Sequence, residues 1–395
     1  MATLPVKKHA NMDKRTFLKH LGTGALSLTA SSWLLSSCQN ASPETGTTET
    51  PTLSEKEKFW VWARPQSEWT LDDWKAKLGQ AREAGINALL LEVYNGNKTF
   101  YQGGQLPMEE DLVSRVAPLC HELGMEFHAW MWTMPLTNPD MVEKHPDWYA
   151  VNGLGEPANT DPAYVPYYKF MCPCHPEVRE YVAGNVASLA RIPEVDGVHL
   201  DYVRLPDVIL AKGLQPKYDI VQDKEYPQYD YSYSTYCRDQ FKEQTGIDPL
   251  TDLEDPSANE EWRQFRYDAV SNMVNNSLVP EARKQGKMIT AAVFPNWESV
   301  RQAWHTWDLD AFLPMLYHNF YERDIDFIQE HTRKALERMK TPKPIYSGLF
   351  IPEIKPEQLD AAIQEGLEGG ASGSSFFALG AMQDAHWEAL KKVTR

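Results

Sequence analysis

Positive charge is scarce in this chain of 395 residues. Lys and Arg number 39 against 55 Asp and Glu, which gives a formal net charge of -16. Residues 1–37 hold five of the basic residues and one Asp, so the remainder has 34 basic against 54 acidic residues, a net charge of -20. A surface of that sign repels nucleic acid and anionic lipid headgroups. We therefore expect no nucleic-acid partner.

The chain also lacks a long hydrophobic run and a glycine-rich phosphate loop. The apolar stretch from Leu21 to Ser37 is too short, and too rich in Ser, Thr and Gly, to span a membrane. The first predicted strand is followed by Arg64-Pro-Gln-Ser67, without the glycines of a dinucleotide site. The sequence shows no repeat of fixed short period, which argues against a solenoid. No two His residues lie at helical ligand spacing with a carboxylate between them, which argues against a metal site of that kind. We expect neither a cofactor nor a catalytic metal.

Cysteine is rare, with five residues in the whole chain. The segment Cys172-Pro-Cys174-His175 is half of what a zinc site needs, but no second cluster follows at a recognisable spacing. We therefore predict structural or free thiols. Whether Cys120 pairs with Cys237 stays open.

The first residues predict export. Lys14, Arg15 and Lys19 precede the apolar run, as in a signal peptide, and the segment is similar to a twin-arginine signal with Lys in place of the first Arg. The run ends in Leu34-Leu-Ser-Ser-Cys38, which resembles the lipobox of bacterial lipoproteins, where the cysteine is lipidated. We expect an export signal over residues 1–37, a Ser-, Thr-, Pro- and Glu-rich disordered tether over 38–57 and one folded domain over 58–395.

Apolar residues are plentiful beyond the tether. Hydrophobic residues make up 42% of the chain, and 13 Trp, 18 Tyr and 14 Phe can fill a large core. Short apolar runs alternate with amphipathic stretches, which is typical of a parallel sheet covered by helices. We predict eight strands: Phe59–Arg64, Ala88–Tyr94, Glu126–Trp132, one within 196–206, Met288–Phe294, Ala311–Tyr317, Pro344–Phe350 and Gly373–Leu379.

Eight strand and helix pairs in roughly 330 residues predict a single (β/α)8 barrel, with a doubly wound open sheet as the alternative. Residues 207–256 interrupt the alternation after the fourth strand. They are dense in Tyr, Asp and Pro and lack clear periodicity. Insertions of this length are usually functional or mobile.

The fourth strand carries the strongest functional signal, in the segment Asp196-Gly-Val-His-Leu-Asp-Tyr-Val-Arg-Leu-Pro206. Its Val and Leu residues are typical of a buried strand, yet Asp201 and Arg204 lie among them. Pro206 ends the strand, which places both at its carboxyl end, where barrel enzymes hold their catalytic residues.

The other strand ends add carboxylates, amides, histidines and indoles, a combination that suits sugar hydroxyls and the apolar faces of sugar rings. The predicted ring around the barrel mouth contains Glu92, Asn95, His128, Trp130, Trp132, Asp201, Arg204, Asn296, Trp297, Glu298, Tyr317, His318, Asn319 and Glu353.

Glycosidic bond cleavage ordinarily needs two carboxyl groups. We predict Asp201 as nucleophile or electrostatic stabiliser, held ionised by Arg204, although the two could also form a structural ion pair. Glu298 is our candidate proton donor, although its segment could simply cap the next helix. Glu92 competes with it, with substrate binding as its main role. His128 and His318 could equally be core histidines, and some of Trp130, Trp132 and Trp297 could be core residues.

The segment 196–206 resembles a signature of the glycosyl hydrolase-like 10 family. Lys144-His-Pro-Asp-Trp-Tyr149, Cys174-His-Pro-Glu-Val-Arg179 and Pro314-Met-Leu-Tyr317 are similar to further elements of that family, in the same order. The resemblance covers residues 59–380 and implies a barrel, export to the bacterial envelope and hydrolysis of cell-wall or other glycans. It also implies that Asp201 is catalytic, with Tyr202 and Arg204 beside it.

Two functions fit these observations. The first is an envelope lipoprotein that hydrolyses a polysaccharide or cell-wall glycan, anchored to the membrane through lipidated Cys38 alone. The second is a glycan-binding lipoprotein without catalysis, because a fold does not dictate a function.

Overall fold

The computed structural model describes residues 57–394, so the predicted signal, Cys38 and nearly all of the tether lie outside the described residues. The described part holds one eight-stranded parallel sheet in the order β6-β5-β4-β3-β2-β1-β8-β7. Two isolated parallel bridges, Phe312 to Ile345 and Met315 to Gly348, join the two ends of this sheet. The predicted (β/α)8 barrel is confirmed, and the open sheet is not.

The strands agree with the predicted ones to within a few residues. Their bounds are β1 (Lys58–Ala63), β2 (Ala88–Tyr94), β3 (Glu126–Trp132), β4 (Gly197–Asp201), β5 (Met288–Val293), β6 (Ala311–Pro314), β7 (Ser347–Phe350) and β8 (Gly373–Phe377).

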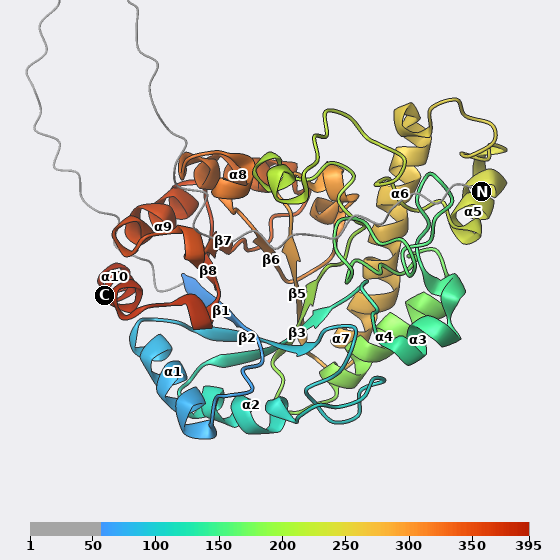
Figure 1. The fold of residues 1–395 in the computed structure, drawn as a ribbon. Helices are drawn as coiled ribbons and strands as arrows, with labels where there is room; N and C mark the ends of the chain where they lie inside the picture. The colour runs from blue at the N-terminus through green and yellow to red at the C-terminus, as the bar shows by residue number, and fades with distance from the viewer. Residues whose placement is uncertain (1–56, 395) are drawn as a thin grey trace, which may run out of the picture. The chain divides into compact units, whose positions relative to one another are not determined.

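Helices surround the strands on the outside (Figure 1). They are α1 (Leu71–Glu83), α2 (Leu112–Glu122), α3 (Pro139–Lys144), α4 (Pro176–Ala190), α5 (Thr235–Thr245), α6 (Glu260–Met273), α7 (Val279–Arg283), α8 (Asp326–Arg338), α9 (Leu359–Glu368) and α10 (Asp384–Val393). Among the described helices, none has the length and apolar character needed to cross a membrane.

Local sequence signals set several helix ends. Thr70 caps α1 and forms a capping box with Asp73. Gly85 and Gly124 follow α1 and α2 with φ angles of 92° and 66°, a left-handed conformation that glycine adopts without steric cost. The π-helical turn η4 (Val274–Leu278) joins α6 to α7, whose second residue is Pro280.

Alternate residues of each strand face the helices and the barrel interior. In β1, Phe59, Val61 and Ala63 belong to the large core under the helices, whereas Trp60 and Trp62 belong to a separate interior cluster. Both faces are therefore buried, which explains why the strands are apolar runs without polar alternation. The interior is packed side chains, so a substrate can enter only at the strand ends.

The insertion after β4 is more ordered than its sequence indicates. It contains the helix α5 and the 3-10 segment η2 (Lys212–Tyr218), which the aperiodic sequence did not predict.

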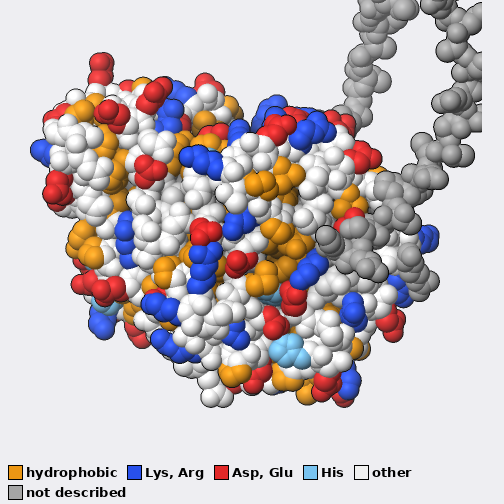
Figure 2. All heavy atoms as spheres, turned by 180° about the vertical axis from the view of Figure 1, so that it is seen from behind, with side chains coloured by type: hydrophobic (Ala, Val, Ile, Leu, Met, Phe, Trp, Pro, Cys, Tyr) orange, Lys and Arg blue, Asp and Glu red, His pale blue; other side chains and the backbone are white. Residues whose placement is uncertain are grey.

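On the face opposite to that of Figure 1, acidic and basic side chains are interspersed with small apolar patches (Figure 2).

Candidate active site

A cavity of about 270 Å³ lies at the carboxyl ends of the strands. Most of its lining comes from strand ends, as expected, but the insertion and the segment before α4 add further walls. Its charged lining residues are Arg64, Asp201, Arg204, Asp207 and Lys217. Its aromatic ones are Trp130, Tyr164, Tyr167, Tyr168, Tyr202, Tyr218, Phe294, Tyr317, Phe320, Tyr321, Phe350 and Phe377.

Asp201, the last residue of β4, presents a fixed carboxyl group to this cavity. The indole Nε1–H of Trp130 donates to Oδ2 at 3.1 Å, and the backbone N–H of Tyr202 donates to Oδ1 at 2.7 Å. Tyr202 has a φ angle of 52°, a conformation that is costly for a bulky residue and typical of functional sites. The turn at Tyr202 therefore positions the carboxyl group.

Burial raises the pKa of Asp201 to about 6, although the two hydrogen bonds and the charge of Arg204 act in the opposite direction. We expected Arg204 to hold this carboxylate ionised, and that expectation needs correction. The Arg204 guanidinium donates to Asp207 Oδ2 at 3.0 Å and to the Tyr168 hydroxyl at 3.1 Å. Because its ion pair is with Asp207, Arg204 only partly offsets the desolvation of Asp201.

Glu92 of β2 is a further buried carboxyl group near this end of the barrel, but it does not line the cavity. Its partners are Trp132 Nε1 at 3.2 Å, Asn95 Nδ2 at 3.4 Å and Arg64 Nε at 3.6 Å. Burial raises its pKa, and the nearby charge of Asp201 adds to the rise. Asn95 therefore positions Glu92 and does not itself face the cavity.

One strand supplies the indole partners of both carboxyl groups. Trp130 and Trp132 are two residues apart on β3, so they point the same way. In the ladder, Glu92 of β2 is opposite Trp130, and Asp201 of β4 is opposite Trp132. The hydrogen bonds cross this register, because Trp130 donates to Asp201 and Trp132 donates to Glu92. These side-chain bonds tie β2, β3 and β4 together near the strand ends.

In the described segment between β5 and β6, only Phe294 lines the cavity, and the residues from Asn296 to Glu298 do not. Glu298 lies in a 3-10 turn, its side chain is 48% exposed, and its carboxylate is 3.6 Å from Arg338. Asn296 accepts a hydrogen bond from the Tyr321 hydroxyl, and Trp297 packs against Tyr267. The chain leaves the cavity after Phe294, which places all three predicted residues outside it.

The predicted histidines also lie elsewhere. His128 is fully buried near the start of β3, where Nε2 is 3.1 Å from Glu126. His318 is in the 3-10 turn after β6 and does not line the cavity. Tyr317, by contrast, does line it, and burial together with the charge of Asp201 raises its pKa.

Several lining residues were missed. Arg64 directly follows β1, so the strand-end rule could have found it. Its guanidinium lies 5.9 Å from the Trp130 ring centre and 5.4 Å from that of Phe377. Tyr164, Tyr167 and Tyr168 come from an irregular segment whose only signal is its density of tyrosine.

A model of the glycosyl hydrolase-like 10 family matches residues 70–364. Among curated proteins, glycosyl hydrolase YngK of Bacillus subtilis (strain 168) is 21% identical over 223 residues. That alignment covers 51% of this chain and 36% of YngK, so this chain matches only about a third of that protein.

Solved structures show the same fold. The PgaB (BpsB) glycoside hydrolase domain from Bordetella bronchiseptica has a TM-score of 0.63 at 16% identity, covering 86% of this chain and 98% of that one. The catalytic domain of β-amylase from Paenibacillus polymyxa has a TM-score of 0.62 at 10% identity, covering 87% and 98%. At such identities the likeness concerns the barrel and not the substrate.

Proposed function

Since the chain belongs to the glycosyl hydrolase-like 10 family, we propose that it is an exported glycoside hydrolase that cleaves a polysaccharide or cell-wall glycan, with Asp201 as its catalytic carboxylate. The observation that carries this proposal is the placement of Asp201. Its carboxyl group lines the cavity at a strand end, and both oxygens are held by N–H donors. A group so fixed costs little reorganisation when charge develops in the transition state.

The charge state of Asp201 fits this role. With a pKa of about 6, the group is mostly ionised at neutral pH and can stabilise or attack an oxocarbenium-like centre. The other cavity carboxylate, Asp207, is neutralised by its ion pair with Arg204. The aromatic lining supplies flat apolar faces for sugar rings.

For the proton donor, we now favour Glu92 over Glu298. Burial raises the pKa of Glu92, which favours the protonated form that a general acid needs. Arg64 lines the cavity, its side chain is 50% exposed, and its Nε lies 3.6 Å from the Glu92 carboxylate, so a substrate that displaces Arg64 would approach this carboxyl group. Glu298 lies at the surface, paired with Arg338.

Release of reducing ends from peptidoglycan glycan strands and a panel of polysaccharides tests the proposal. Asp201→Asn should abolish release while the protein stays folded. Glu92→Gln should slow cleavage of natural glycans far more than cleavage of aryl glycosides, whose leaving groups need no proton. Glu298→Gln is the matched control and should retain full activity. Turnover by Asp201→Asn at the unsubstituted rate would refute the assignment.

The alternative is a glycan-binding lipoprotein without catalysis. It is favoured by one observation, that Asp201 is the only carboxylate without an ion-pair partner among the described cavity-lining residues. This alternative predicts binding of oligosaccharides in calorimetry without release of reducing ends from any member of the panel.

The proposal includes anchoring through Cys38, which rests on the sequence of the first 38 residues. Expression of the full chain in a bacterial host should place it in the membrane fraction, whereas Cys38→Ser should release it. Equal membrane retention of both proteins would contradict the anchor.

A further inference from the structure

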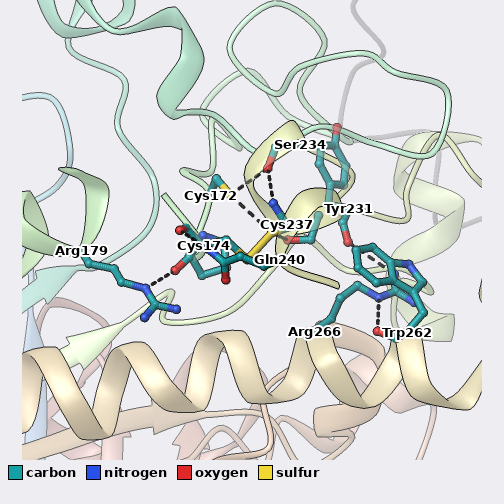
Figure 3. Close-up of a disulfide and its surroundings, with 11 residues drawn as sticks. Cys172, Cys174, Arg179, Tyr231, Ser234, Cys237, Gln240, Trp262 and Arg266 are labelled. Atoms are coloured by element: carbon teal, nitrogen blue, oxygen red, sulfur yellow. Dashed lines mark hydrogen bonds between the residues drawn. A yellow bond between two sulfur atoms is a disulfide. The ribbon is translucent and has the colours of Figure 1, made fainter. Parts of the chain in front are cut away.

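Three buried sulfur atoms meet outside the lining of the cavity. Cys172 and Cys174 precede α4, and Cys237 lies in the first turn of α5. Their Sγ atoms all lie within 4.8 Å of one another, and a disulfide joins Cys174 to Cys237 (Figure 3). No other group of three or more metal-ligating side chains this close occurs among residues 57–394.

The disulfide does not account for the position of the third sulfur, that of Cys172. Cys172 is a free, fully buried thiol whose Sγ lies 3.5 Å from that of Cys237. Thiol–disulfide exchange needs the attacking sulfur in line with the bond that breaks. In a line of three sulfurs, the Cys172–Cys174 distance would equal the 3.5 Å contact plus an S–S bond of about 2 Å. The actual distance is at most 4.8 Å, so the three sulfurs are not in line. The sulfurs form a triangle, which suits ligands around one ion.

Three hydrogen-bonding groups surround the sulfur of Cys172. The Ser234 hydroxyl lies 3.0 Å from Sγ, and the backbone N–H groups of Cys174 and His175 also bond to it. Such hydrogen bonds to a ligand tune and orient it in metal sites.

We propose that, when the disulfide is reduced, Cys172, Cys174 and Cys237 together bind one thiophilic d10 cation, Zn²⁺ or Cu⁺. Soft thiolates select these ions. His175 is not a ligand, because its Nε2 is 3.2 Å from Asp147 and its Nδ1 accepts from the Glu177 N–H. Zn²⁺ would take the Ser234 oxygen or water as a fourth ligand, whereas Cu⁺ accepts three sulfurs alone.

The chemistry balances with a dithiol reductant. The dithiol gives two electrons and two protons to the Cys174–Cys237 bond and becomes a disulfide itself. The two resulting thiols and the thiol of Cys172 then lose their protons to the solvent as the cation binds. Either state joins the segment before α4 to α5, so the insertion stays attached in oxidising and in reducing surroundings.

Metal content tests this proposal directly. The purified full-length protein is reduced with dithiothreitol, desalted without oxygen, incubated with Zn²⁺ or with Cu⁺ and dialysed, and the bound metal is measured by mass spectrometry. We expect one ion per chain with at least one of the two cations. Co²⁺ in place of Zn²⁺ should give an intense sulfur-to-metal absorption band, a readout that needs no variant.

Cys172→Ser and Cys120→Ser form a matched pair, because both residues are buried free cysteines and only the first belongs to the triangle. Cys172→Ser should keep the disulfide and the melting temperature of the oxidised protein. It should weaken metal binding more than ~10- to 100-fold, which is the cost of losing only a hydrogen-bond partner of a ligand. Cys120→Ser should bind as the unsubstituted chain does. Absence of both stoichiometric metal and the Co²⁺ band, or equal binding by the two variants, would overturn the proposal.

Discussion

Asp201→Asn should change how stability depends on pH, in addition to removing activity. Burial raises the pKa of Asp201 from 3.8 to about 6 in the folded chain. A raised folded-state pKa adds stability below the unfolded value, and that stability is lost as the pH rises through the folded value. At about 1.36 kcal/mol for each pH unit, the loss amounts to about 3 kcal/mol. Asparagine does not ionise and escapes this loss.

The free energy of unfolding should therefore rise for Asp201→Asn relative to the unsubstituted chain as the pH increases. The difference in unfolding free energy between the two proteins should grow by about half of the ~3 kcal/mol between about pH 5 and 7 and stay constant above that range. Any hydrogen bond lost to Trp130 or Tyr202 shifts the whole curve and leaves its slope unchanged. Urea unfolding at several pH values measures the difference. A difference that does not vary with pH would show that Asp201 ionises as in an unfolded chain.

Three further substitutions test other contacts. Trp130→Phe removes the N–H donor to the Asp201 carboxylate, a hydrogen bond worth about 1.5–3 kcal/mol. The acid limb of the rate–pH profile should therefore move upward from about 6 by about 1–2 pH units, and an unmoved limb would contradict the assignment. Arg204→Met leaves Asp207 buried without its partner and should lower the unfolding free energy by about 3–5 kcal/mol, whereas a loss below about 1 kcal/mol would mean that water reaches Asp207. Gly197→Ala places a methyl group 2.4 Å from the His128 ring and should cost about 1–3 kcal/mol in urea unfolding, and no loss would show that the ring can move.

The barrel could be predicted from the sequence because both faces of every strand are buried. Apolar runs such as Ala88–Tyr94 then stand out against the amphipathic helices between them. The helix α5 escaped prediction because it packs mainly through Cys237 and Phe241, too few apolar positions to give a periodic signal. Its place depends on the disulfide to Cys174, 63 residues away, which no local pattern reveals.

The strand-end rule found part of the candidate site and misplaced the rest. It identified Asp201, Trp130 and Tyr317 because each belongs to an inward-facing row near a strand end. It failed for Glu298 because the chain enters a 3-10 turn after β5, a local conformation that the sequence does not specify. For His128 the inward direction was right, but the residue lies too far from the strand end to face the cavity.

The barrel wall is not equally strong around its circumference. Seven of its junctions are continuous ladders, and the eighth, between β6 and β7, consists of two single bridges. The strands that bear Glu92, the paired indoles and Asp201 occupy the middle of the continuous arc, about as far from that seam as the circle allows. Opening at this seam would move Tyr317 and Phe350, which line the cavity, but would leave β2, β3 and β4, with the proposed catalytic carboxyl groups, joined by their ladders.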